Sequence, residues 1–149
     1  MLTHRFSTSA VLQAPPEKVY HVIADYHHQH PQIIPKPPFV SLKVEKGGFG
    51  AGTHLYVEMK VLGKIQAFRG LVSEPDPGRK LIESYDTGYV TSFEIEACGP
   101  QSSFVRIATE IPFKPGLGAY LERLLIPRFL RPVYAKELGL IEAAARRLS

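Results

Sequence analysis

The sequence predicts an α+β fold in which a curved antiparallel sheet of seven strands wraps a long C-terminal helix. Strand-like runs separated by turn residues follow one another at short intervals through the middle of the chain, and helix formers replace the turn residues after Pro115. A length of 149 residues is typical of one domain. We therefore assign residues 1–149 to a single domain with one sizeable core.

The first strand and helix are marked by a change of periodicity. Residues 3–13 alternate between apolar and polar side chains, as in a strand with one buried face. Pro15 and Pro16 end this strand and suit the first turn of a helix, whose apolar stripe runs over 19–26. The proline-rich segment that follows leaves room for one helical turn, around 31–34.

Six further strands are predicted, and Gly, Pro, Asp and Ser mark the turns between them. The predicted strands span 39–46, 53–62, 64–74, 80–86, 89–97 and 103–111. Short turns between consecutive strands are typical of an antiparallel meander and not of βαβ units. The glycine-rich turn 47–52 lacks the lysine and the following helix of a phosphate-binding loop, so we interpret it as a hairpin loop at a pocket rim.

The alternation within the strands predicts which side chains face the core. The inward set comprises Leu55, Val57, Met59, Phe93, Ile95, Val105, Ile107 and Ile111. Strand 64–74 leaves two alternatives open, because Arg69 and Leu71 compete with Phe68 and Gly70 for the inner face. If the turn at 75–79 closes a hairpin, Tyr85 lies across from Gly70 and covers it.

The C-terminal segment carries two apolar stripes at helical spacing, one over 117–124 and one over 130–148. Pro127 and Pro132 each remove a helical hydrogen bond, so we expect a kink or a short break there. The longest regular helix is then expected over 132–148.

Composition excludes several classes of protein. With 44% apolar and 21% charged residues the chain is expected to be folded and soluble, and with a single cysteine, Cys98, it forms no internal disulfide. It contains no apolar run long enough for a transmembrane segment, so we expect a cytoplasmic protein. The net charge of +4 comes partly from basic residues spread between the apolar stripes of the terminal segment, which does not favour nucleic acid as a partner.

Four histidines near Asp25, at positions 21, 27, 28 and 30, are the one cluster of metal-ligating residues. They follow one another along a proline-rich segment that we interpret as an exposed turn, without the spacing of a known metal motif. We therefore expect no metal and no cofactor. The sequence carries no signal for an oligomeric state.

Several motifs resemble those of the SRPBCC or START-like superfamily, which includes polyketide cyclase/dehydrase-like proteins, coenzyme Q-binding proteins and lipid-transfer domains. The matching features are the entry segment 12–20, Asp25-Tyr26 with His30-Pro31 and Pro35, the hairpin 74–79 and the closing helix. The resemblance implies a helix-grip fold, with a cavity between the sheet and the terminal helix.

The resemblance implies binding or carrying of a small hydrophobic ligand, such as a lipid, a quinone or a polyketide-like molecule. The residues expected to bind it are Leu55, Val57, Met59, Phe93, Ile95, Val105, Ile107, Tyr120, Leu121 and Leu124. The alternative is a polyketide cyclase or dehydratase, for which Arg69, Glu83 and Tyr85 are the catalytic candidates because a buried acid, base or cation can move a proton or stabilise an enolate. A third hypothesis is an interaction module that uses the outer surface.

Overall fold

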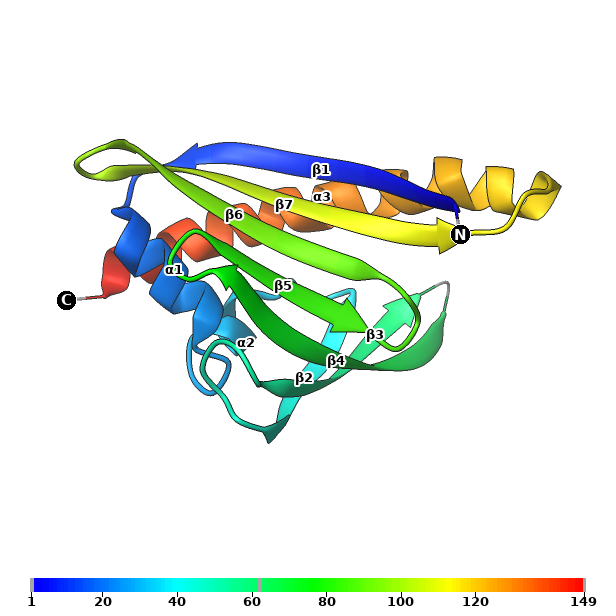
Figure 1. The fold of residues 1–149 in the computed structure, drawn as a ribbon, viewed down its shortest axis with the longest axis horizontal. Coiled ribbons are helices and arrows are strands. Elements are labelled where there is room, and N and C mark those ends of the chain that lie inside the picture. Colours follow the sequence, from blue (N-terminus) through cyan, green and yellow to red (C-terminus); the bar gives the residue numbers. More distant parts are fainter. Residues whose placement is uncertain (1, 62, 149) are drawn as a thin grey trace.

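A curved sheet wrapped against one long helix organises the computed structural model, which describes residues 2–61 and 63–148 (Figure 1). The elements in chain order are β1 (Leu2–Leu12), α1 (Pro16–Ala24), α2 (His30–Ile33), β2 (Phe39–Lys46), β3 (His54–Val61), β4 (Lys64–Asp76), β5 (Lys80–Tyr85), β6 (Val90–Gly99), β7 (Ser102–Phe113) and α3 (Leu117–Arg147). The predicted end of strand 53–62 and the two ends of the predicted domain, residues 1 and 149, lie outside the described residues.

The sheet has seven antiparallel strands in the order β1-β7-β6-β5-β4-β3-β2. Consecutive strands from β2 to β7 are neighbours, which confirms the predicted meander, and β1 joins the sheet beside β7. The fold is the expected α+β helix grip.

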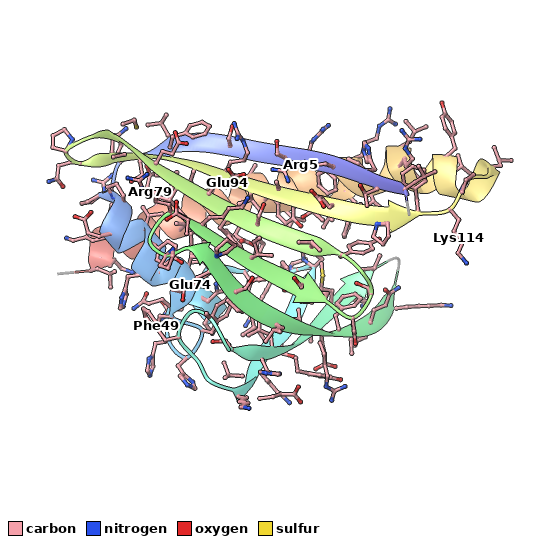
Figure 2. All side chains as sticks on the ribbon, viewed as in Figure 1. Arg5, Phe49, Glu74, Arg79, Glu94 and Lys114 are labelled. Atoms are coloured by element: carbon pink, nitrogen blue, oxygen red, sulfur yellow. The ribbon has the colours of Figure 1, made fainter. Side chains whose placement is uncertain are left out.

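The outer face of the sheet is polar. Arg5 on β1 lies 3.3 Å from Glu94 on β6 and 3.4 Å from Glu110 on β7, and Figure 2 shows Arg5 and Glu94 together on this face. These ion pairs are well exposed to solvent, so each contributes about 1 kcal/mol or less. The opposite face of the same strands therefore supplies the apolar surface that must be covered.

The predicted inward residues of β3, β6 and β7 are buried, apart from the half-buried Met59. On β4 the structure chooses between the two alternatives: Gly70 and Val72 are buried, whereas Arg69 is exposed. Gly70 pairs with Tyr85, and a Cβ added at Gly70 would lie 2.8 Å from Cε1 of the Tyr85 ring. The predicted cover of glycine by tyrosine is confirmed, and it directs the even-numbered residues of β4 inward.

The predicted break in the terminal helix is wrong, because α3 runs without interruption from Leu117 to Arg147 with both prolines inside it. A proline within a helix costs about 3 kcal/mol. The burial of residues such as Tyr134, Leu138 and Ile141 offsets that cost by holding the helix against the sheet. Among the described residues, no helix is long and apolar enough to cross a membrane.

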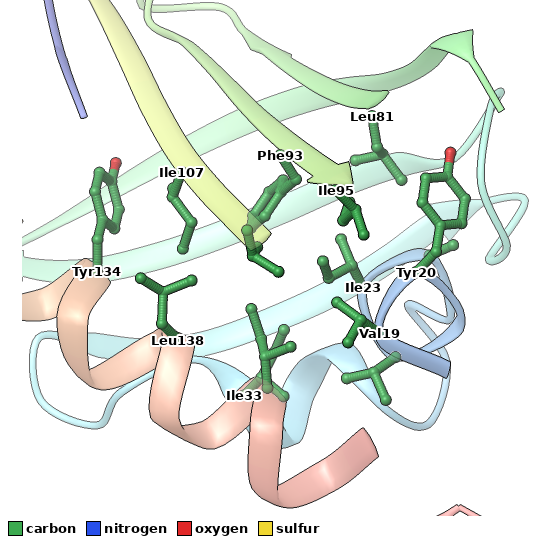
Figure 3. Close-up of a cluster of buried hydrophobic side chains, with 14 of the residues drawn as sticks. Val19, Tyr20, Ile23, Ile33, Leu81, Phe93, Ile95, Ile107, Tyr134 and Leu138 are labelled. Carbon is green, nitrogen blue, oxygen red and sulfur yellow. The ribbon is translucent and has the colours of Figure 1, made fainter. Parts of the chain in front are cut away.

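The hydrophobic core fills the end of the molecule where α1 crosses the C-terminal half of α3 (Figures 1 and 3). Val19 and Ile23 of α1 pack with Ile33 of α2, with Ile95 of the sheet and with Leu138 of α3. The first turns of α3 instead project beyond the end of the sheet (Figure 1). The middle of α3 spans the remaining space over β3 to β6.

The glycine-rich turn 47–52 packs against α1 and not against the pocket rim as expected. The backbone N–H of Tyr26 donates to the carbonyl of Gly48 at 2.9 Å, and the N–H of Gly50 donates to the carbonyl of Ala24 at 2.9 Å. This loop therefore fixes the end of α1 and the position of Tyr26.

Candidate functional site

A cavity of about 230 Å³ lies between the middle of α3 and the inner faces of β3 to β6. Its described lining consists of His30, Ile34, Phe39, Leu42, Val57, Met59, Val61, Gln66, Phe68, Glu83, Tyr85, Thr87, Tyr89, Thr91, Phe93, Ile126, Phe129, Leu130, Tyr134 and Glu137. Most of these side chains are apolar or aromatic, as in pockets that bind small organic molecules.

Burial divides the lining into a mouth and a floor. Gln66, Thr87 and Phe129 are exposed and mark the mouth, between the β3–β4 hairpin, the β5–β6 turn and α3. His30, Glu83 and Glu137 are buried, with exposed fractions of 2%, 5% and 3%. We refer to these three residues as the cavity floor. The cavity therefore combines apolar walls with a polar, buried end.

Glu83 on β5 is held by two tyrosine hydroxyls. Tyr26 donates to one carboxylate oxygen at 2.5 Å, and Tyr85 donates to the other at 2.7 Å. Burial, together with the charge of Glu83, raises the pKa of both tyrosines well above 10, so both remain protonated donors. Because each oxygen accepts an O–H, this is the hydrogen-bonding pattern of an ionised carboxylate.

His30 on α2 is stacked against the ring of Tyr26, with 4.3 Å between ring centroids. Its Nδ1 lies 2.6 Å from the carbonyl oxygen of Ile23, which can only accept, so Nδ1 carries the proton. Burial lowers the pKa of His30, against the opposing effect of Glu83, so the ring is neutral at pH 7. Nε2 then presents a lone pair, 3.6 Å from a carboxylate oxygen of Glu83.

Glu137 on α3 differs from Glu83 in having no hydrogen-bond or ion-pair partner among the described residues. Burial raises the pKa of this carboxyl well above 4.5, and the negative charge of Glu83 raises it further. The surroundings of Glu137 therefore favour its neutral, protonated form. The floor thus contains two acids in different surroundings, since Glu83 accepts from two tyrosine hydroxyls and Glu137 accepts from none of the described side chains.

Tyr134 on α3 closes the wall beside the floor. Its hydroxyl lies 2.7 Å from that of Thr109, which lies 3.1 Å from the hydroxyl of Thr91. This chain ties the helix to β6 and β7, and Figure 3 shows Tyr134 reaching from α3 toward the sheet. The position of α3 over the cavity is therefore fixed by polar as well as apolar contacts.

Comparison with known protein families identifies the family of this chain. A family model described as polyketide cyclase/dehydrase and lipid transport matches residues 3–146. The chain belongs to this family. A comparison with curated protein sequences found no match.

Solved structures share the fold of this family member at low sequence identity. The KanY protein is 20% identical with a TM-score of 0.84, covering 98% of this chain and 99% of its own. The Zhui aromatase/cyclase from Streptomyces sp. R1128 is 13% identical with a TM-score of 0.75, covering 98% and 95%. A START superfamily protein from Mycobacterium smegmatis is 17% identical with a TM-score of 0.76, covering 94% and 98%.

Only some of the residues predicted to bind the ligand line the cavity. Val57, Met59 and Phe93 line it, whereas four others are buried in the core outside its lining. These four are Leu55, Ile95, Val105 and Ile107. They point to the inner side of the sheet as predicted, but α1 and the C-terminal half of α3 cover that part of the sheet and leave no space there.

Tyr120, Leu121 and Leu124 were expected in the cavity wall of this family member, and this prediction is wrong. Their exposed fractions are 57%, 49% and 43%, because the first turns of α3 extend past the sheet. Tyr120 instead lines a shallow surface depression beside Phe113.

Two of the three catalytic candidates line the cavity together, and one does not. Glu83 and Tyr85 are hydrogen-bonded to each other in the lining. Arg69 points to the outer face, where its side chain is 64% exposed and pairs with Glu45 at 3.1 Å. The physical reason is the inward position of Gly70, since neighbouring residues on a strand point to opposite faces.

Sequence reasoning missed His30 and Glu137. The histidines do not form one exposed cluster: His21 and His28 flank Asp25, whereas His30 is buried in the cavity floor. Within the described residues no group of three His, Cys, Asp or Glu side chains could hold a metal ion. A signal for Glu137 existed, because it lies at helical spacing between Tyr134 and Ile141 on the buried stripe.

Proposed function

We propose that the protein binds a compact hydrophobic molecule in this cavity, with a polar group of the ligand at the floor. The observation that carries the proposal is the cavity itself, whose apolar walls lead from an exposed mouth to buried acids. Ligand pockets commonly measure about 300–1,000 Å³. At about 230 Å³ this cavity suits a small ring system or a short chain better than a two-chain lipid.

Family membership supports the same function, because the family description joins cyclase/dehydrase chemistry with lipid transport. Apolar ligand surface removed from water contributes about 25 cal/mol per Å² before association costs. The walls therefore supply affinity and the floor supplies orientation.

The test is native mass spectrometry of the protein purified from cells, followed by titration with quinones, fatty alcohols and small polycyclic aromatics. Leu42→Trp fills the cavity from its wall, whereas Leu71→Trp makes the same change on the exposed face of β4. We expect binding to be lost in Leu42→Trp and retained in Leu71→Trp. Equal binding by both variants would place the ligand outside the cavity and overturn the proposal.

A second candidate function is a cyclase or dehydratase reaction on the bound molecule. It is favoured by one observation, the buried Glu137, whose pKa is raised, in the same cavity as His30, whose pKa is lowered. Glu137 can donate a proton to a leaving hydroxyl, and the bare Nε2 of His30 can accept one from carbon.

This reaction is tested by returning the ligand recovered from purified protein to fresh protein and following its mass. Loss of water with wild-type protein, and much slower loss with Glu137→Gln, is the expected result. A ligand whose mass and ring closure stay unchanged would leave binding as the function.

A further inference from the structure

The cavity floor has hydrogen-bond acceptors without matching donors. Both Glu83 oxygens accept from tyrosines, and the bare Nε2 of His30 faces one of them at 3.6 Å. An imidazole lone pair opposite a carboxylate oxygen leaves two acceptors with no hydrogen between them. A ligand group that donates hydrogen bonds would satisfy both.

Glu137 adds a second carboxyl to the floor, and none of the hydrogen bonds or ion pairs of the described residues involves it. Because its side chain lines the cavity, this carboxyl is open to a ligand placed there. The described lining includes Glu83 and Glu137 but neither Lys nor Arg. The only charges that the described lining can present to a ligand are therefore negative.

The walls around this floor are rich in aromatic rings. Those in the described lining are Phe39, Phe68, Tyr85, Tyr89, Phe93, Phe129 and Tyr134. The faces of such rings attract cations, and the attraction is stronger where water is excluded. Aromatic walls and an acidic floor thus favour the same sign of charge on a ligand.

We propose that the ligand is a compact hydrophobic amine whose ammonium group lies at the cavity floor beside Glu83 and Glu137; this rests on the proposed binding function. An ammonium group has three donors and no acceptor, which complements the floor. An alcohol offers one donor, and a carboxylate or phosphate offers none and meets like charge. Fatty acids and anionic headgroups are therefore excluded from the floor.

Binding of an amine is coupled to release of a proton. The carboxyl proton of Glu137 leaves for solvent as the ammonium group enters, and an ion pair replaces the neutral acid. The titratable groups around Glu137 are Glu83 and Tyr85 from β5, His30 from α2, Tyr26 and, on its own helix, Tyr134. The raised pKa values of the tyrosines and the lowered pKa of His30 keep these groups neutral near pH 7, so Glu137 is the group that releases the proton.

The test uses three probes with the same ring: cyclohexylmethylamine, cyclohexylmethanol and cyclohexanecarboxylate. Isothermal titration at pH 7 in two buffers of different ionisation enthalpy measures affinity and proton release together. We expect the amine to bind at least about tenfold more tightly than the alcohol, because desolvation of the ammonium offsets much of the charge attraction. Release of about one proton per amine is expected, and none for the alcohol.

Two matched variants assign the effect to the floor. Glu137→Gln replaces a neutral acid by a neutral amide of the same shape, and its fold is checked by thermal unfolding. In this variant the proton release should vanish and the ratio of amine to alcohol affinity should fall toward one. Glu96→Gln removes an exposed carboxyl on β6 and should leave both quantities as in the wild type.

The outcomes separate this inference from the proposed function. Alcohol binding equal to amine binding, or preferred binding of the carboxylate, overturns the amine and leaves the hydrophobic cavity as the site. An amine preference that survives in Glu137→Gln without proton release also overturns the role given to Glu137. If none of the three probes binds, the amine proposal fails, whereas the binding function is decided separately by the native mass spectrometry and the Leu42→Trp variant.

Discussion

Replacing Glu137 by methionine is expected to make the protein more stable while it removes a polar group from the cavity floor. The two side chains are similar in length and in helix propensity. The side chain is 3% exposed and faces the cavity, and holding a polar group away from bulk water without a protein hydrogen bond costs about 1–3 kcal/mol. Glu137→Met should therefore raise the free energy of unfolding by about 2 kcal/mol at pH 4.5, where the acid is protonated in the folded state and still half protonated in the unfolded chain.

The gain should grow with pH. Because the pKa of Glu137 is raised in the folded state, the folded protein holds this proton more tightly than the unfolded chain does. The contribution of that proton is fully present below 4.5 and is lost as the pH rises toward the folded pKa. The slope is at most about 1.4 kcal/mol per pH unit. Between pH 5 and pH 7 the advantage of methionine therefore grows by up to about 2.8 kcal/mol.

Urea denaturation of both proteins across pH 4.5–7.5 measures this difference. The lowered pKa of His30 gives a contribution of opposite sign, with stability gained as the pH rises through its folded pKa toward 6.5. Both proteins retain His30, so this contribution largely cancels in the difference. Glu96→Met serves as the control on the exposed face. A methionine variant that is less stable throughout, or whose advantage does not grow with pH, would refute the assignment of Glu137 as a buried neutral acid.

Three further predictions concern the surroundings of the floor. Gly70→Ala places a Cβ 2.8 Å from the Tyr85 ring and should cost about 1–3 kcal/mol in urea denaturation, and an unchanged midpoint would show that the ring moves freely. Tyr26→Phe removes a donor at 2.5 Å from the Glu83 carboxylate and should cost about 1.5–3 kcal/mol, whereas a loss below about 0.5 kcal/mol would contradict this hydrogen bond. Arg69→Ala breaks an exposed ion pair and should change the free energy of unfolding by no more than about 0.5 kcal/mol. Ligand affinity should stay unaltered, and weakened binding would show that Arg69 belongs to the binding site.

Most of the sheet could be predicted because local chemistry decides it. Alternation identified the inner residues of β3, β6 and β7, and the turn residues placed the hairpins close to where the structure has them. The inner face of β4 could not be chosen by pattern, since both of its faces carry apolar residues. The contact between Gly70 and Tyr85, which belongs to the neighbouring strand, decides it.

The site was harder to predict because it depends on which part of the inner face is left uncovered. Leu55 and Val57 share one face of β3, yet only Val57 lines the cavity, because Leu55 is fully buried within the packed core. The first turns of the uninterrupted α3 also leave Tyr120 exposed and outside the cavity lining. Glu137 was not predicted to line the cavity because an acid in a helix is usually solvated, although its spacing placed it on the buried stripe.

The pairing of β1 with β7 joins Leu2 to Phe113 and Leu12 to Ser103, so on the ribosome β1 finds its partner only after β7 has emerged. Closing so long a loop is entropically costly and makes folding slow, since contacts distant in sequence must form together. The helix that covers the cavity, α3, is synthesised after β7. A nascent chain therefore carries the apolar inner face of its sheet uncovered until α3 has emerged, and during that interval it is most prone to aggregation and most dependent on chaperones.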